Sequence, residues 1–146
     1  MSEPTESRRV VAESRPLPSL EETPYAREFW DAATEGRLVV QRCETCARMQ
    51  YFPRPRCGTC GGSVEWIEAS GLGTVFSHTV IRRPVSNPAF RETVPYVTAY
   101  VTLEEGPRLF TRLVGCEPDT VERGMPVSVA FEQVSETVTL PTFEPR

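Results

Sequence analysis

The sequence predicts a mainly β protein with one N-terminal helix, on three observations. From residue 63 onward, hydrophobic and polar residues alternate with a period of two, the spacing of strands with one buried face. Four of the five cysteines form two C-x-x-C pairs, and a single helical pattern lies before them. We therefore divide the 146 residues into a tail (1–22), a helix (23–36), a cysteine module (37–62) and a β body (63–146).

The composition is that of a soluble globular chain. The net charge is −4 and 39% of the residues are hydrophobic, which excludes the disordered, fibrous and membrane-embedded classes. No apolar run approaches the roughly 18 residues of a membrane span, and the first residues lack the apolar core of a secretory signal. We therefore expect a cytoplasmic protein without membrane contact, where paired cysteines bind metal more often than they form disulfides.

The tail of residues 1–22 combines low hydrophobicity with many charges and several prolines. Such a segment buries too little apolar surface to offset the entropy lost on ordering, so we expect it to be disordered. The alternative is an arm that orders against a partner, with "RPLPSL" as its anchor.

Residues 23–36 have the start and stop signals of a helix of about three turns. Thr23 can cap the helix, Pro24 suits its first position, and Gly36 can end it in the left-handed conformation.

This helix carries an aromatic stripe. Tyr25, Phe29 and Ala33 are spaced by four and share one face, which Ala26 and Trp30 widen. Such a stripe usually packs against its own domain, but it can also dock on another subunit. Tyr25, Phe29 and Trp30 are therefore our candidates for a partner interface.

The two C-x-x-C pairs predict a structural zinc site. Zinc takes four ligands in tetrahedral geometry, and each C-x-x-C knuckle supplies two thiolates from one tight turn. Because all four positions are filled by protein, such a zinc is structural rather than catalytic. The predicted ligands of this rubredoxin-like zinc ribbon are Cys43, Cys46, Cys57 and Cys60, with strands at 37–42 and 48–53 beside the first knuckle.

The cysteine module is also the basic part of the chain. Residues 37–62 carry five arginines and one acid. Four thiolates around a divalent cation leave a local charge of −2, which nearby arginines would offset. The arginines concerned are Arg42, Arg48, Arg54 and Arg56. An alternative to zinc is iron, as in a rubredoxin-like electron carrier.

The β body contains five or six short strands. In "PYVTAYVTL", Val97, Ala99, Val101 and Leu103 share one face. So many strands in so short a segment favour a small closed barrel, which leaves no exposed edge strand, and a five-stranded OB-fold barrel fits best. The predicted strands are 64–70, 73–83, 95–103, 107–115, 126–131 and 137–141.

Catalytic groups are scarce in the sequence. The single histidine, His78, follows Ser77 directly, and neighbours on a strand point to opposite faces. Cys116 has no histidine or cationic cluster near it in the sequence, so it reads as a small buried residue rather than a nucleophile. We therefore expect no catalysis by this chain alone.

Nucleic-acid binding is the alternative function, because OB folds and zinc ribbons both serve it. Single-strand binders need stacking aromatics in a positive groove, but residues 63–146 carry eleven acids and seven arginines, which argues against a polyanion. The same arginines would suit a smaller phosphorylated ligand, or be ordinary solvated charges. The candidates are Phe76, Phe90, Tyr96, Tyr100 and Phe110 for stacking, and Arg82, Arg83, Arg91 and Arg112 for phosphates.

The ordered motifs from Pro24 to Pro145 resemble a known family. They are "REFWDAATEGRLVVQRC", "FPRPRCGTC", "EWIEASGLGTVFSHTV", "PYVTAYVTLEEGPRLFTRLVG", "ERGMPVSVAFE" and "LPTFEP". Together they resemble the zinc-ribbon and OB-fold proteins, long known as a domain of unknown function, that accompany thiolase-like acyl-CoA enzymes. Ala47 departs from the family pattern, which usually has glycine after the second cysteine.

The resemblance implies a non-catalytic accessory subunit in a hetero-oligomer, in lipid or steroid metabolism. Its partner would be a thiolase-fold enzyme: a thiolase, an acyl-CoA aldolase or a hydroxymethylglutaryl-CoA synthase. The ribbon and helix would supply docking surface, and the barrel would lie near the path of the CoA ester. On this view Arg82, Arg83 and Arg91, around a predicted loop, are candidates for CoA phosphate binding. The family also contains members fused to hydratase-like domains.

Overall fold

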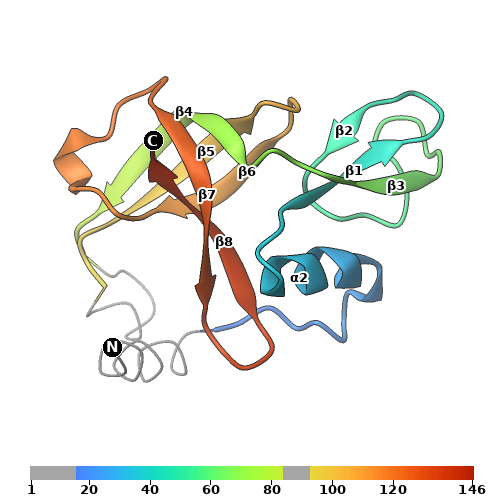
Figure 1. Ribbon diagram of the computed structural model, residues 1–146, viewed down its shortest axis with the longest axis horizontal. Helices are drawn as coiled ribbons and strands as arrows, with labels where there is room; N and C mark the ends of the chain where they lie inside the picture. Colours follow the sequence, from blue (N-terminus) through green and yellow to red (C-terminus); the bar gives the residue numbers. More distant parts are fainter. Residues whose placement is uncertain (1–15, 84–92) are drawn as a thin grey trace.

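A computed structural model describes residues 16–83 and 93–146 of the chain. Most of the tail assigned to residues 1–22 lies outside this part, and so does Arg91. The chain forms a short helix, a three-stranded cysteine ribbon and a closed barrel. Figure 1 shows the barrel on the left, the ribbon on the right, and the helix below the ribbon.

The helix begins with a tighter turn than the sequence pattern predicts. A 3₁₀ turn, η1 (Pro24–Ala26), leads into the α-helix α2 (Arg27–Thr34). Gly36 follows with φ of 77°, the left-handed conformation expected for a residue after the helix. The expected cap is wrong, because the Thr23 hydroxyl donates to the carbonyl oxygen of Ser19 and caps neither turn.

The buried face of the helix differs from the predicted stripe. Phe29 is only 3% exposed, whereas Tyr25 is 40% exposed. Tyr25 lies in the 3₁₀ turn, where four-residue spacing no longer places side chains on one face. Phe29 packs edge-on against Trp30 and Tyr51, with ring centroids 5.0 and 5.6 Å apart. The helix therefore packs against the ribbon through Phe29, and Tyr25 remains exposed to solvent.

The ribbon is a three-stranded antiparallel sheet in the order β2-β1-β3. Its strands are β1 (Val39–Cys43), β2 (Met49–Gln50) and β3 (Val64–Glu68). The strand expected at 64–70 as part of the β body thus pairs instead with β1, from Cys43 opposite Val64 to Val39 opposite Glu68. After the second cysteine knuckle the chain returns directly beside β1. β3 therefore pairs with β1 in the ribbon, and the barrel begins only with the next strand.

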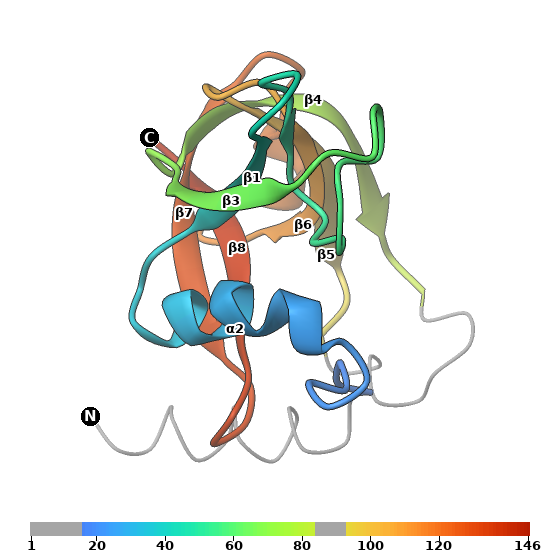
Figure 2. The same cartoon turned by 90° about the vertical axis from the view of Figure 1, so that its right-hand side faces the viewer.

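Five strands close the barrel in the order β4-β5-β6-β8-β7. All neighbours are antiparallel except β6 and β8, which are parallel where Leu113 lies opposite Phe143. Figure 2 shows β7 and β8 forming one wall of the ring and β5 and β6 the other. The strands are β4 (Leu72–Ile81), β5 (Tyr96–Leu103), β6 (Arg108–Leu113), β7 (Pro126–Gln133) and β8 (Thr139–Pro145), with the 3₁₀ turn η3 (Pro118–Thr120) before β7.

The alternation in the sequence sets the barrel interior. On β5 all four residues of the predicted inner face are buried, while their neighbours on the other face are partly or fully exposed. Phe143 of β8 and Val127 of β7 are completely buried and fill the space between the walls. The predicted mainly β fold, with helix, zinc ribbon and five-stranded barrel, is confirmed.

No helix in residues 16–83 and 93–146 is long and apolar enough to cross a membrane.

Gly73 is required at a position of β4 that pairs with both neighbouring strands. It lies opposite Leu103 of β5 and also opposite Val127 of β7. A Cβ atom at this position would lie 2.6 Å from the backbone oxygen of Thr102. Because that contact is with backbone, no side-chain rotation can relieve it.

We expect Gly73→Ala to lower the free energy of unfolding by about 1–3 kcal/mol, the usual cost of overpacking. Urea denaturation followed by tryptophan fluorescence measures this loss. Thr74→Ala, at the next residue with an exposed side chain, serves as the control and should change stability by less than about 0.5 kcal/mol. Equal stability of the two variants would contradict the close approach.

Candidate metal centre

The two C-x-x-C pairs fold into knuckles of the same design. In the first, the backbone N–H of Ala47 donates to the carbonyl oxygen of Cys43 at 3.0 Å. In the second, the N–H of Gly61 donates to the carbonyl oxygen of Cys57, also at 3.0 Å. Ala47 and Gly61 both have positive φ, 64° and 75° respectively. Each knuckle therefore turns through a left-handed residue directly after its second cysteine.

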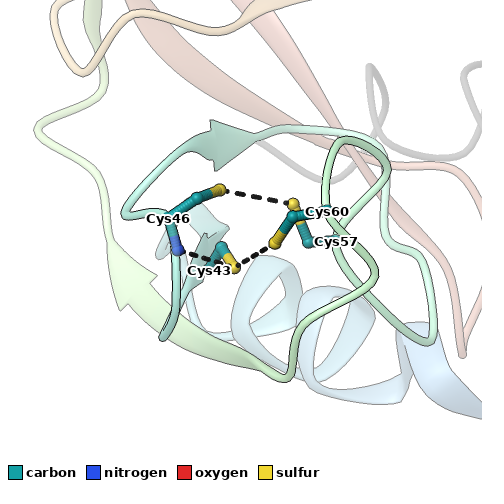
Figure 3. A group of neighbouring side chains, drawn as sticks. All are labelled: Cys43, Cys46, Cys57 and Cys60. Atoms are coloured by element: carbon teal, nitrogen blue, oxygen red, sulfur yellow. Dashed lines mark hydrogen bonds between the residues drawn. The ribbon is translucent and has the colours of Figure 1, made fainter.

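The knuckles bring the four predicted ligands together. The sulfur atoms of Cys43 and Cys60 are 3.4 Å apart and those of Cys46 and Cys57 are 3.7 Å apart. All four sulfur atoms lie within 4.8 Å of one another, and Figure 3 shows them facing a common centre. Zinc–sulfur bonds of 2.3 Å in a tetrahedron place sulfur atoms about 3.8 Å apart. The cluster therefore fits one four-thiolate zinc.

Backbone N–H groups stabilise the thiolate form of two of the four cysteines. The N–H groups of Cys60 and Thr59 lower the pKa of Cys57 to about 6. The N–H of Cys46 likewise lowers the pKa of Cys43. At Cys60 the backbone N–H of Gly62 lowers the pKa, but the thiols of the other three cysteines together with burial raise it to about 11. Four ionised thiols at such short distances therefore need a divalent cation between them.

A buried glutamine links β1 to the second knuckle. Gln41 is 1% exposed, and its side-chain amide donates to the carbonyl oxygen of Arg54 and accepts from the N–H of Arg54, both at 2.9 Å. Gln50 donates to Gln41 and accepts from the N–H of Gly58. These bonds hold the loop that carries Cys57. Gln41 was not among the residues predicted from the sequence, although a polar residue in the apolar segment "LVVQRC" could have indicated it.

The arginines of the ribbon lie on its surface. All four side chains expected to offset its charge are exposed. Arg56 donates to the carbonyl oxygen of Gly61 in the second knuckle at 3.1 Å. The side chain of Arg54 extends over Gly58 of the same loop. Two of the arginines therefore also support the knuckle that carries Cys57 and Cys60.

The arginines suggested for CoA phosphates lie at the start of the connection from β4 to β5. Arg82 forms an ion pair with Asp119 at 2.7 Å, with both side chains largely exposed. Arg83 is exposed, and Arg91 is outside the described residues. The structure therefore shows a partner for Arg82 and does not test the proposed phosphate site.

Neither the Ser77–His78 pair nor Cys116 has the surroundings of a catalytic group. On β4, Ser77 lies opposite the exposed Tyr100, whereas His78 lies opposite the buried Ala99, so the two side chains occupy opposite faces of the strand. Burial raises the pKa of the Cys116 thiol, and Glu117 adds to the shift. Such a thiol is less nucleophilic than an ordinary one.

Comparison with known proteins agrees with this architecture. Residues 30–65 match the family model described as "ChsH2, rubredoxin-like zinc ribbon domain", and residues 66–132 match "ChsH2, C-terminal OB-fold domain". A "DUF35 domain-containing scaffold protein" of Methanothermobacter thermautotrophicus is 36% identical over 101 residues, 68% of this chain and 74% of that protein. The chain belongs to the DUF35 family.

Two further proteins match this chain over different shares of their own length. A "Probable enoyl-CoA hydratase alpha subunit" of Thermomonospora curvata is 43% identical over 134 residues, but this chain spans only 40% of its length. A solved structure titled "Ltp2-ChsH2(DUF35) aldolase" contains a chain that is 40% identical, with a TM-score of 0.75. That match covers 90% of this chain and 98% of the other. The comparisons and the cysteine cluster confirm the resemblance and the predicted structural zinc.

We expect serine in place of any one of the four cysteines, for example Cys57→Ser, to abolish stable zinc binding and make the protein insoluble. Metal binding and ribbon folding are one equilibrium, so losing a ligand removes both. Most of the variant should be found in the insoluble fraction, and zinc per chain in the dialysed protein that stays soluble, measured by mass spectrometry, should fall from about one to near zero. Cys116→Ser is the control and should keep its zinc. Full occupancy in Cys57→Ser would contradict the site.

We expect Ala47→Gly to stabilise the first knuckle. An L-residue in the left-handed conformation costs about 1–2 kcal/mol, of which glycine's greater freedom in the unfolded chain cancels about half. The variant should therefore gain up to about 1 kcal/mol and lose zinc more slowly to a chelator.

Gly61→Ala is the matched test of this explanation. A Cβ atom at Gly61 meets no other atom within 4 Å, so only the backbone conformation opposes it. This variant should release zinc faster than the parent protein. If both substitutions shifted the rate in the same direction, the left-handed turns would not be its cause.

Proposed function

We propose that this protein is a non-catalytic accessory subunit that binds and supports a thiolase-fold enzyme acting on acyl-CoA. One observation carries the proposal. The chain matches, over 90% of its own length and 98% of the other chain, a structure whose title names Ltp2 with ChsH2(DUF35) as an aldolase. The name "scaffold protein" of the Methanothermobacter relative is in keeping with a supporting role.

The zinc site supports a structural role for this subunit. The four sulfur atoms complete the coordination of a tetrahedral ion, so no position is left for substrate or water. Cys43 and Cys57, which hold the inner side of the cluster, are buried. A zinc held in this way stabilises the fold and cannot act as a Lewis acid. On this proposal the chemistry belongs to the enzyme partner.

The helix and the ribbon offer docking surface for that partner. Phe29 is committed to the interior, which leaves the exposed ring of Tyr25 and the half-buried Trp30 as the helix candidates. The ribbon adds Phe52, whose side chain is 67% exposed among the arginines of the basic module. Exposed aromatics with arginine are typical of the central part of protein interfaces.

The CoA ester would lie near the connection between β4 and β5 on this proposal. Arg82 and Arg83 stand at its start and Arg91 lies within it. The exposed ion pair between Arg82 and Asp119 is weak enough for a phosphate to displace the carboxylate. An acidic protein can hold a few phosphates in this way without a basic face.

The proposal is tested by affinity purification of the tagged protein from its native cells, at two salt concentrations and with and without nuclease. We expect an acyl-CoA enzyme of the thiolase fold to co-elute in a fixed ratio and to survive nuclease. Removing this subunit should lower the solubility or activity of that enzyme. Turnover of an acyl-CoA by the isolated chain, or full activity of the enzyme without it, would contradict the proposal.

A further inference from the structure

Three exposed aromatic rings gather on the outer side of the barrel. Phe76, Tyr100 and Phe110 are 42%, 48% and 59% exposed. Tyr100 of β5 and Phe110 of β6 lie directly opposite one another in register, with ring centroids 5.2 Å apart. Phe76 sits at the irregularity of β4, between Val75 opposite Val101 and Ser77 opposite Tyr100. The bulge therefore adds a third aromatic beside the first two.

Two arginines complete this surface. Arg108, Phe110 and Arg112 alternate along the outer side of β6. The guanidinium of Arg108 lies 3.7 Å from the ring centroid of Phe76, and that of Arg112 lies 5.0 Å from the centroid of Tyr96. Arg108 also donates to the hydroxyl of Thr102. We call these residues the aromatic–arginine face: Phe76, Tyr96, Tyr100, Phe110, Arg108 and Arg112.

The charge of this face is opposite to that of the rest of the barrel. The strands β4, β5 and β6 contain no aspartate or glutamate. The eleven acids of residues 63–146 all lie on other segments. An acidic protein thus exposes one acid-free sheet surface with two arginines. A molecule that complements it would present carboxylates around an apolar contact.

The composition of the face is that of a protein-binding hot spot. The cores of protein interfaces are enriched in aromatic residues and arginine, and depleted of lysine and acids. The stacked arginines are held in place before any partner arrives, so binding orders fewer side chains. A single nucleic-acid strand would need a continuous positive groove, and two arginines on a chain of net charge −4 do not provide one.

We propose that the aromatic–arginine face is the main surface of the barrel through which this chain holds its enzyme partner, in addition to the helix and the ribbon, and that the partner presents an apolar patch bordered by carboxylates to it. The inference rests on the proposed function and adds where the contact is made. The helix contributes less, because its central aromatic ring, Phe29, is buried within the chain. By contrast, Phe110 has the greatest exposure among the described aromatics of the barrel.

A photo-crosslinking experiment tests the location. Benzoylphenylalanine is placed at position 110 of the full-length tagged chain in its native cells, and at position 123 as the control, since Arg123 is exposed outside the face. After irradiation, the crosslinked peptides are identified by mass spectrometry. We expect position 110, and not position 123, to join a peptide of an acyl-CoA enzyme that contains apolar residues next to aspartate or glutamate.

The other outcomes separate the two proposals. If the enzyme co-purifies but crosslinks equally from both positions, or from neither, the face is wrong and the accessory role stands. A crosslink from position 110 to this chain's own residues, to a second copy or to nucleic acid also overturns the face. The crosslinked peptide can also contain apolar residues next to aspartate or glutamate but belong to a protein that is not an acyl-CoA enzyme. This result supports the face as a binding surface and contradicts the proposed function.

Binding of the co-purified enzyme then measures the contribution of the face. Y100S/F110S should weaken binding by at least about tenfold, the loss typical of a hot spot. R108E/R112E should weaken it at least as much and reduce its salt dependence. The controls are Q133S and R123E, exposed residues elsewhere, and both should bind within about twofold of the parent protein. Zinc content and circular dichroism confirm folding, and unchanged affinity of both face variants overturns the inference.

Discussion

The four-thiolate centre is the constraint on which the arrangement of the chain depends. Cys43 ends β1, so a metal that joins Cys43 to Cys60 fixes the return of the chain beside β1. That return places β3 against β1, and the completed sheet supplies the surface on which Phe29 and Tyr51 meet. A short helix has little stability alone. The position of the helix therefore depends in part on the ribbon, with β8 of the barrel as its other support, and the ribbon depends on the metal.

Local patterns predicted the parts of the structure that local physics determines. The C-x-x-C spacing is enough for two ligands per turn, and the alternation on β5 is enough to assign its inner face. The placement of β3 could not be predicted in this way, because the pattern of a short strand carries no information on which sheet will pair with it. The position of Tyr25 was missed for a similar reason. The 3₁₀ turn winds more tightly than an α-helix, which moves the Tyr25 side chain off the face that carries Phe29.

The candidate sites also differ in how far the sequence predicts them. The metal ligands come from one short segment, and the sequence alone identified all four. The aromatic–arginine face combines residues from three strands, and only the pairing register brings Tyr100 opposite Phe110. The bulge at Phe76 adds a shift that no period-two pattern contains. Gln41 shows the same limit, since its partners Arg54 and Gln50 are joined to it only by the fold.

The parallel contact between β6 and β8 has a consequence for synthesis on the ribosome. β8 is the last strand of the barrel in the chain, yet it lies between β6 and β7, so the ring cannot close before Thr139–Pro145 has left the exit tunnel. The cysteines, by contrast, are separated by at most 17 positions and emerge much earlier. The nascent chain can therefore take up its metal and form a small folded lobe while the barrel strands are still unpaired. Metal supply during translation thus acts on the first folding step, ahead of any contact with an enzyme.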